Sequence, residues 1–197
     1  VTLYFIDITK EEELANKYNN AKTCIGIVVL DNYEEIIQRI SEESKLQLIA
    51  TIEKKLYEWA NTCGGLIVKK ERDTYVFVFE QQYLEKMENN KFTILDEIKE
   101  IEADDGMPIT LTIAISNEGA TIYEKYESTT VAMDIALGRG GDQAVIKTKD
   151  KFAFYGGKSK AVEKTTKVKS RLIGHALREV ILESDHVFIM GHKYPDM

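Results

Sequence analysis

The chain has 197 residues, 44% hydrophobic and 30% charged, a composition that is typical of a globular domain and excludes disordered or collagen-like chains. Its formal net charge of −7 argues against a general nucleic-acid binder, because such proteins neutralise phosphates with cationic surfaces. No apolar run approaches the ~20 residues that cross a bilayer, and the first residues lack the basic start of a signal peptide. The two cysteines, Cys24 and Cys63, are too few for a disulfide framework and suit a reducing compartment, where we expect them to be small buried residues.

Short apolar strands are predicted at both ends of the chain. Val1–Ile8 alternates between two apolar faces, and His186–Met190 is a second apolar run near the other end. A strand at a terminus needs a sheet to join. We therefore interpret the chain as a segment of a longer protein.

Between these ends the sequence predicts strands and helices in alternation. The continuous apolar run Cys24–Leu30 is expected to be a central strand that is covered on both faces. The other predicted elements are a short polar helix from Thr9, helices of about Glu34–Asn61 (with a break at Ser41–Lys45), Leu84–Ile101 and Ala120–Leu137, and strands over Leu66–Lys70, Thr74–Glu80, Ile109–Ile115, Gln143–Lys147 and Phe152–Tyr155. This order is the split βαβ pattern of ferredoxin-like α+β domains, with one antiparallel sheet and helices on one side.

A basic, amphipathic segment follows the last predicted hairpin. Between Lys158 and Arg171 the sequence has six basic residues against Glu163, and an apolar stripe begins at Leu172. The pattern predicts a linking helix whose second half packs on the next domain. A solvated helix face explains the basic residues better than binding to phosphates or to an anionic membrane.

An aspartate after the first long strand and a hairpin at mid-chain resemble the GGDEF domains, the nucleotidyl-cyclase palm that makes cyclic-di-GMP. The resemblance implies carboxylates that hold Mg²⁺ on nucleotide phosphates and hairpin glycines that let the substrate approach. Here Val29 stands where the first metal-binding aspartate is expected, and the hairpin reads Glu71-Arg72-Asp73-Thr74-Tyr75, without the glycines or the catalytic glutamate. The positions that would read guanine fall on the apolar Ile37 and Leu46. We therefore predict a degenerate domain that is not a diguanylate cyclase.

Three residues remain candidates for binding a nucleotide in such a domain. Asp31 and Asp73 would lie at the end of the first strand and in the hairpin, and the alternative is that they cap a strand end and a turn. Arg139 would supply the charge of a phosphate-binding loop within Gly138–Asp142. A helix C-cap and turn also explains these glycines, and we favour it, because phosphate loops normally precede a helix and this loop follows one.

The last residues are similar to the opening H-x-x-P-D motif of DHH phosphoesterases. His192-Lys-Tyr-Pro-Asp196 follows the predicted strand His186–Met190 directly. In that family the histidine and the aspartate ligate a pair of Mn²⁺ ions that activate water against a phosphodiester. We predict His192 and Asp196 as metal ligands, with a surface turn as the alternative.

The combination is more specific than any one motif. The degenerate palm ending in Ala132–Val145, the basic helix and the H-x-x-P-D motif together resemble the cyclic-di-AMP phosphodiesterases of the GdpP (YybT) type over essentially the whole chain. The resemblance implies five segments: residues 1–9 as the last strand of a PAS-like domain, 10–21 as a linker helix, 22–157 as the degenerate GGDEF domain, 158–184 as a linking helix and 185–197 as the start of a DHH domain.

The same resemblance implies a function for the longer protein. It would be a homodimer, anchored at the cytoplasmic face of the cell membrane, whose DHH/DHHA1 module uses Mn²⁺ to hydrolyse cyclic-di-AMP to pApA. Haem would belong to its PAS domain, and the segment described here would be regulatory. The alternatives for this segment are a weak ATP-hydrolysing domain that uses Mg²⁺, or a dimerisation module.

Overall fold

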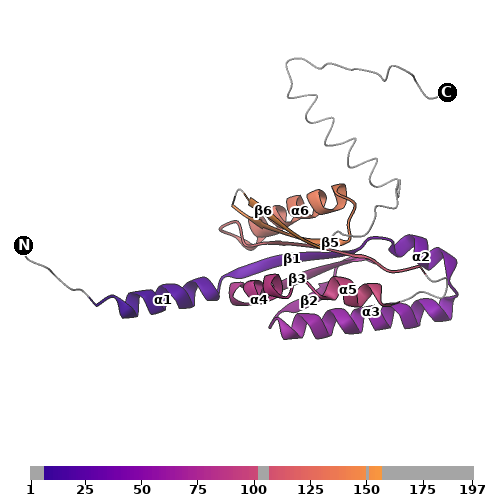
Figure 1. Ribbon diagram of the computed structural model, residues 1–197, viewed down its shortest axis with the longest axis horizontal. Coiled ribbons are helices and arrows are strands. Elements are labelled where there is room, and N and C mark those ends of the chain that lie inside the picture. Colours follow the sequence, from indigo (N-terminus) through magenta and orange to yellow (C-terminus); the bar gives the residue numbers. More distant parts are fainter. Residues whose placement is uncertain (1–6, 102–106, 150, 157–197) are drawn as a thin grey trace, which may run out of the picture. The chain divides into compact units, whose positions relative to one another are not determined.

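A computed structural model describes residues 7–101, 107–149 and 151–156 (Figure 1). The predictions for residues 1–6, for the linking helix over 158–184 and for the segment 185–197, with His192 and Asp196, lie outside the described residues. In chain order the elements are α1 (Thr9–Asn20), β1 (Thr23–Leu30), α2 (Tyr33–Arg39), α3 (Glu42–Thr62), β2 (Leu66–Lys69), β3 (Thr74–Glu80), the 3₁₀ turn η1 (Gln81–Tyr83), α4 (Leu84–Asn89), α5 (Ile94–Lys99), β4 (Leu111–Ser116), α6 (Ile122–Gly138), β5 (Gln143–Thr148) and β6 (Lys151–Gly156).

The strands form one six-stranded sheet in the order β2-β3-β1-β4-β5-β6. The apolar strand β1 lies inside the sheet, where it pairs antiparallel with β3 on one side and with β4 on the other. The predicted α+β class is therefore confirmed. One detail differs, because β4 and β5 pair in parallel. A parallel pair needs a crossover connection, and α6 provides it.

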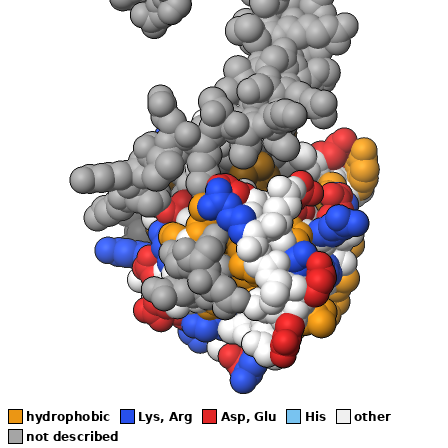
Figure 2. All heavy atoms as spheres, turned by 90° about the vertical axis from the view of Figure 1, so that its right-hand side faces the viewer, with side chains coloured by type: hydrophobic (Ala, Val, Ile, Leu, Met, Phe, Trp, Pro, Cys, Tyr) orange, Lys and Arg blue, Asp and Glu red, His pale blue; other side chains and the backbone are white. Residues whose placement is uncertain are grey.

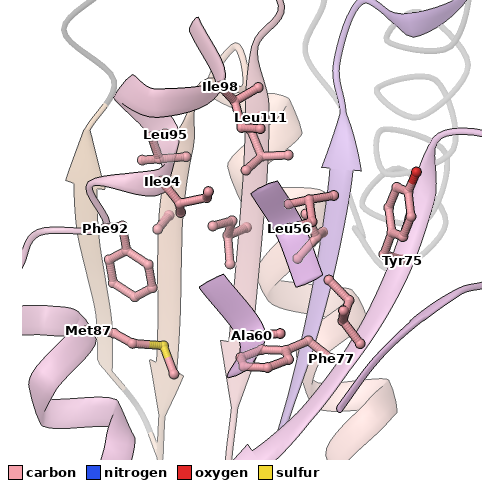
Figure 3. Close-up of a cluster of buried hydrophobic side chains, with 14 of the residues drawn as sticks. Leu56, Ala60, Tyr75, Phe77, Met87, Phe92, Ile94, Leu95, Ile98 and Leu111 are labelled. Carbon is pink, nitrogen blue, oxygen red and sulfur yellow. The ribbon is translucent and has the colours of Figure 1, made fainter. Parts of the chain in front are cut away.

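The helices cover both faces of the sheet, whereas the sequence pattern suggested one. Alternate residues of β1 belong to different clusters: Val28 lies in the larger core and Ile27 in a smaller one. The larger core packs α3, α4 and α5 on one face, and Figure 3 shows Leu56, Phe77 and other members of it. The smaller core packs α6 on the opposite face (Figure 1).

Local signals explain where the helices are interrupted. The predicted break is confirmed, since α3 starts after Ser41, whose side-chain oxygen accepts a hydrogen bond from the Ser44 N–H at 3.2 Å. The predicted helix of Leu84–Ile101 is divided into α4 and α5. Lys91 and Phe92 stand between the two with left-handed φ values of 50° and 55°, and Phe92 is fully buried. In the described part of the chain, no helix combines the length and the hydropathy that spanning a bilayer requires.

Candidate functional site

The end of β1 carries a hydrogen-bonded carboxylate, that of Asp31. Its Oδ1 accepts a hydrogen bond from the Thr112 hydroxyl at 2.5 Å, and its Oδ2 accepts one from the backbone N–H of Asp142 at 2.9 Å. The backbone N–H of Asp31 donates to the Thr110 carbonyl at 3.0 Å. Both carboxylate oxygens are therefore engaged within the protein, by β4 and by the loop that precedes β5.

This loop lies directly against the carboxylate. A Cβ atom on Gly141 would stand 2.9 Å from the carboxylate atoms of Asp31, and the φ of Gly141 is +74°. Only glycine combines this backbone conformation with so close an approach. Gly141 thus allows the loop to pack directly against Asp31.

Burial also changes the pKa of Asp31. Desolvation raises the pKa of its carboxyl group above the ordinary value of 3.8, and the hydrogen bonds from Thr112 and Asp142 oppose this shift. Asp142 lies close by and adds a like charge, which raises the pKa of Asp31 further.

Asp142 connects the loop to the opposite face of the sheet. Its carboxylate is 7% exposed and forms an ion pair with the Lys99 ammonium of α5, with 2.7 Å between Nζ and Oδ1. Its φ is left-handed, at 56°. Asp31, Thr112, Asp142 and Lys99 therefore join β1, β4, β5 and α5 in one polar network.

Asp73 lies at the same edge of the sheet as Asp31. Its carbonyl accepts a hydrogen bond from the Leu30 N–H at 2.9 Å, which places the β2–β3 turn beside the end of β1. Its carboxylate accepts the Thr74 hydroxyl at 2.9 Å. The structure thus brings the backbones of the two predicted residues together, while the carboxylate of Asp73 forms a local contact within the turn.

Arg139 belongs to the loop that packs on Asp31. Its guanidinium lies 4.1 Å from the centroid of the Phe154 ring, and its Nε donates to the Gln143 side chain at 3.3 Å. The N–H groups of Gly140 and Gly141 donate to carbonyls of the last turn of α6, as in a helix C-cap. Arg139 itself is exposed.

This edge does not offer the ligands that Mg²⁺ requires. Val29, where the sequence analysis expects the family's metal-binding aspartate, is paired with Thr74 and packs on the smaller core. Across the described residues, no group of three or more His, Cys, Asp or Glu side chains is placed to hold a metal ion. A hard cation prefers several oxygen ligands, so the described residues here do not fit a nucleotide-bound Mg²⁺.

A small apolar cleft lies where the end of β1 packs against α2 and α3. The cleft, lined by Leu30, Tyr33 and Ile36, has a volume of about 10 Å³, which corresponds to about one water molecule. A larger groove of about 200 Å³ lies elsewhere, between α3 and the α4–α5 segment, where Trp59 and Lys86 line it.

Figure 2 views the molecule from the end at which α2 lies, and its coloured atoms include acidic and basic side chains without one dominant sign.

The sequence interpretation missed Thr112, Lys99 and the role of Asp142. The available signal was weak: Thr112 is one of two threonines in the mainly apolar run Ile109–Ile115, and it is fully buried. A fully buried hydroxyl needs a hydrogen-bond partner, and Asp31 provides it.

Comparison with known proteins shows which family this chain resembles. Residues 28–154 match the family described as "Cyclic-di-AMP phosphodiesterase GdpP-like, GGDEF domain". Cyclic-di-AMP phosphodiesterase GdpP of Geobacillus thermodenitrificans (strain NG80-2) is 42% identical over 99% of this chain, and GdpP of Bacillus subtilis (strain 168) is 36% identical over 99%. The chain spans about 30% of the length of each of these relatives.

Solved structures agree on the fold. The active GGEEF domain of a diguanylate cyclase from Vibrio cholerae aligns with a TM-score of 0.56 and 14% identity, over 70% of this chain and 91% of that one. A diguanylate cyclase/phosphodiesterase from Caldicellulosiruptor saccharolyticus aligns with a TM-score of 0.56 and 13% identity, over 73% and 87%. The predicted nucleotidyl-cyclase palm is confirmed. Since the family match extends over most of the chain, this chain belongs to the GdpP-like GGDEF domains of cyclic-di-AMP phosphodiesterases.

Proposed function

We propose that this chain is a regulatory, non-cyclising GGDEF-like segment of a longer phosphodiesterase that hydrolyses cyclic-di-AMP to pApA. The observation that carries the non-cyclising part is the engagement of Asp31, whose two carboxylate oxygens accept hydrogen bonds from Thr112 and Asp142. Cyclisation of GTP needs carboxylates that are free to hold Mg²⁺ on the triphosphate. The curated relatives named above support the phosphodiesterase part.

The hydrolytic chemistry would then depend on residues outside the described structure. We propose His192 and Asp196 as two ligands of the Mn²⁺ pair, with the remaining ligands in a DHH/DHHA1 module. A membrane anchor at the cytoplasmic face and a haem-binding PAS domain belong to the same proposal for the longer protein. The segment boundaries at residues 9, 21, 157 and 184 are proposed on the same grounds.

Weak ATP hydrolysis is the second candidate. It would require metal-bound phosphates at the edge of the sheet where Asp31 and Asp73 meet, with Arg139 nearby. Asp31 would have to exchange its two internal hydrogen bonds for a metal ligand. This exchange would also release the loop around Gly141, which packs against the Asp31 carboxylate.

A product assay on the purified chain separates these candidates. The chain is incubated with GTP or with ATP, in Mg²⁺ or Mn²⁺, and the products are resolved by chromatography. We expect no cyclic-di-GMP, and its formation would refute the non-cyclising proposal. If ADP appears, an Asp31→Ala variant should abolish it, whereas unchanged turnover would place the ATP site elsewhere.

A further inference from the structure

We infer that the groove between α3 and the α4–α5 segment binds a small aromatic molecule that carries one negative charge. The groove has a volume of about 200 Å³, with α3 and its C-cap on one side and the α4–α5 segment on the other. None of its lining residues belongs to the polar network around Asp31. The inference therefore goes beyond the proposed function and does not depend on it.

The bottom of the groove is apolar. Cys63, Met87 and Phe92 line it and are nearly or fully buried. Figure 3 shows the side chains of Met87 and Phe92 close to each other. Trp59 lines the groove from α3, and the centroid of its ring lies 4.8 Å from that of the Phe77 ring, which supports the indole from the core. Thioether sulfur and aromatic rings both pack favourably on another aromatic ring, so this surface suits a planar apolar body.

One end of the groove carries a positive charge. Lys86 lines the groove from α4, and its side chain is exposed. Burial raises the pKa of the Cys63 thiol, and the nearby charge of Lys86 opposes this shift, so the ammonium lies toward the Cys63 end. Among the described residues, no carboxylate pairs with Lys86. A free ammonium beside an apolar surface can bind one carboxylate, sulfonate or phosphate group of a ligand.

The charges at the other end of the groove compensate one another. Lys55 precedes Cys63 by eight residues, which is about 12 Å along the axis of α3. Its ammonium donates to the Glu97 carbonyl at 3.0 Å, and the Glu97 side chain is exposed beside it. Glu58 adds a second carboxylate, which lies 4.0 Å from Lys54. A second anionic group of a ligand would meet these carboxylates, so the groove should prefer a monoanion to a dianion or a nucleoside polyphosphate.

Trp59 provides a direct readout of ligand binding. It is the single tryptophan of the chain, so its indole N–H gives one assigned NMR signal. The full chain is titrated with naphthalene-2-sulfonate as the monoanionic probe. For a ligand of this size we expect a saturable shift of the signal with a dissociation constant on the order of 1 mM. The matched dianion, naphthalene-2,6-disulfonate, should bind at least about three-fold more weakly, because its second sulfonate would lie near Glu97.

Two charge reversals test the role of Lys86. Lys86→Glu should weaken binding of naphthalene-2-sulfonate at least about five-fold, because the charge that attracts the sulfonate is replaced by one that repels it. Lys91→Glu is the control: it changes the net charge equally, and Lys91 is exposed in the same segment but does not line the groove. This variant should change the dissociation constant less than about two-fold, since the charge lies outside the site. The urea midpoint of each variant checks that it folds.

The comparison of the two sulfonates on the unaltered chain needs no variant. The absence of any shift of the Trp59 signal, or equal weakening by Lys86→Glu and Lys91→Glu, would overturn the inference. Tighter binding of the disulfonate, or of ATP, at the same signal would also overturn it, because the groove would then be a site for polyanions.

Discussion

The carboxylate of Asp31 accepts a hydrogen bond from the backbone N–H of Asp142 at 2.9 Å, joining positions 111 residues apart. The contact closes the end of β1 onto the loop that leads into β5. The carboxylate thus joins β1, β4 and the loop before β5, and this has several measurable consequences.

Removing this acceptor should destabilise the domain. Asp31→Ala leaves the Thr112 hydroxyl without its acceptor, and a buried unsatisfied group costs about 1–3 kcal/mol. The Asp142 N–H loses one of its two acceptors and keeps the Thr112 hydroxyl oxygen, at 3.0 Å. We expect the free energy of unfolding to fall by at least about 1 kcal/mol, which is the cost of one unsatisfied buried group. Urea denaturation followed by circular dichroism measures it. Asp96→Ala, on the exposed side of α5, is the control and should change stability little.

The raised pKa of Asp31 predicts a pH dependence. The folded chain holds this proton more tightly than the unfolded chain does, so the contribution of the group to stability is fully present below pH 3.8 and is lost as the pH rises through its folded pKa. We therefore expect the wild type to exceed Asp31→Asn in unfolding free energy by more near about pH 4 than near about pH 7. Urea unfolding of both chains over this range measures the difference. A difference that is constant with pH, or that grows as the pH rises, would contradict a raised pKa.

Two glycines of one loop region should respond differently to substitution. Gly141→Ala places a methyl group 2.9 Å from the Asp31 carboxylate at a φ of +74°, whereas a Cβ on Gly138 meets no atom within 4 Å. We expect Gly141→Ala to destabilise the chain by roughly 1–3 kcal/mol, and Gly138→Ala to be neutral or stabilising by about 0.4–1 kcal/mol. Thermal unfolding of the two variants measures this. Equal effects would show that the loop does not pack on Asp31 as described.

The thiols should be inert in the folded chain. Burial raises the pKa of Cys24 to about 12 and also raises the pKa of Cys63. Reaction requires the thiolate, so a colorimetric thiol reagent near neutral pH should label neither cysteine until the chain unfolds. After addition of guanidinium chloride, both should react. Rapid labelling of the native chain would show that one cysteine is accessible.

Much of the fold could be predicted from the sequence because its signals are local. The apolar run Cys24–Leu30 predicts a central strand, and β1 is indeed paired on both sides. That run is apolar on both faces, so it already required helices on both faces. The order of the elements pointed to one face only, and the packing of α6 on the second face corrected this.

The site was predictable in part. Asp31 could be recognised because it follows an apolar strand directly. Its hydrogen bonds to Thr112 and Asp142 span 81 and 111 residues, and they depend on the register between β1 and β4 and on a loop with left-handed residues. No local pattern encodes such a register. The same holds for Lys99, which reaches Asp142 from a helix on the opposite face of the sheet.

We propose that the longer protein is a phosphodiesterase whose catalytic chemistry lies outside the palm. Cyclic-di-AMP hydrolysis in Mn²⁺ tests this, with the 197-residue chain compared with a longer form that has the full length of the relatives. We predict that the chain alone releases no pApA, that the longer form releases it, and that Asp196→Ala abolishes this activity while the urea midpoint stays unchanged. Release of pApA by the chain alone, or full activity of the longer Asp196→Ala form, would contradict the account.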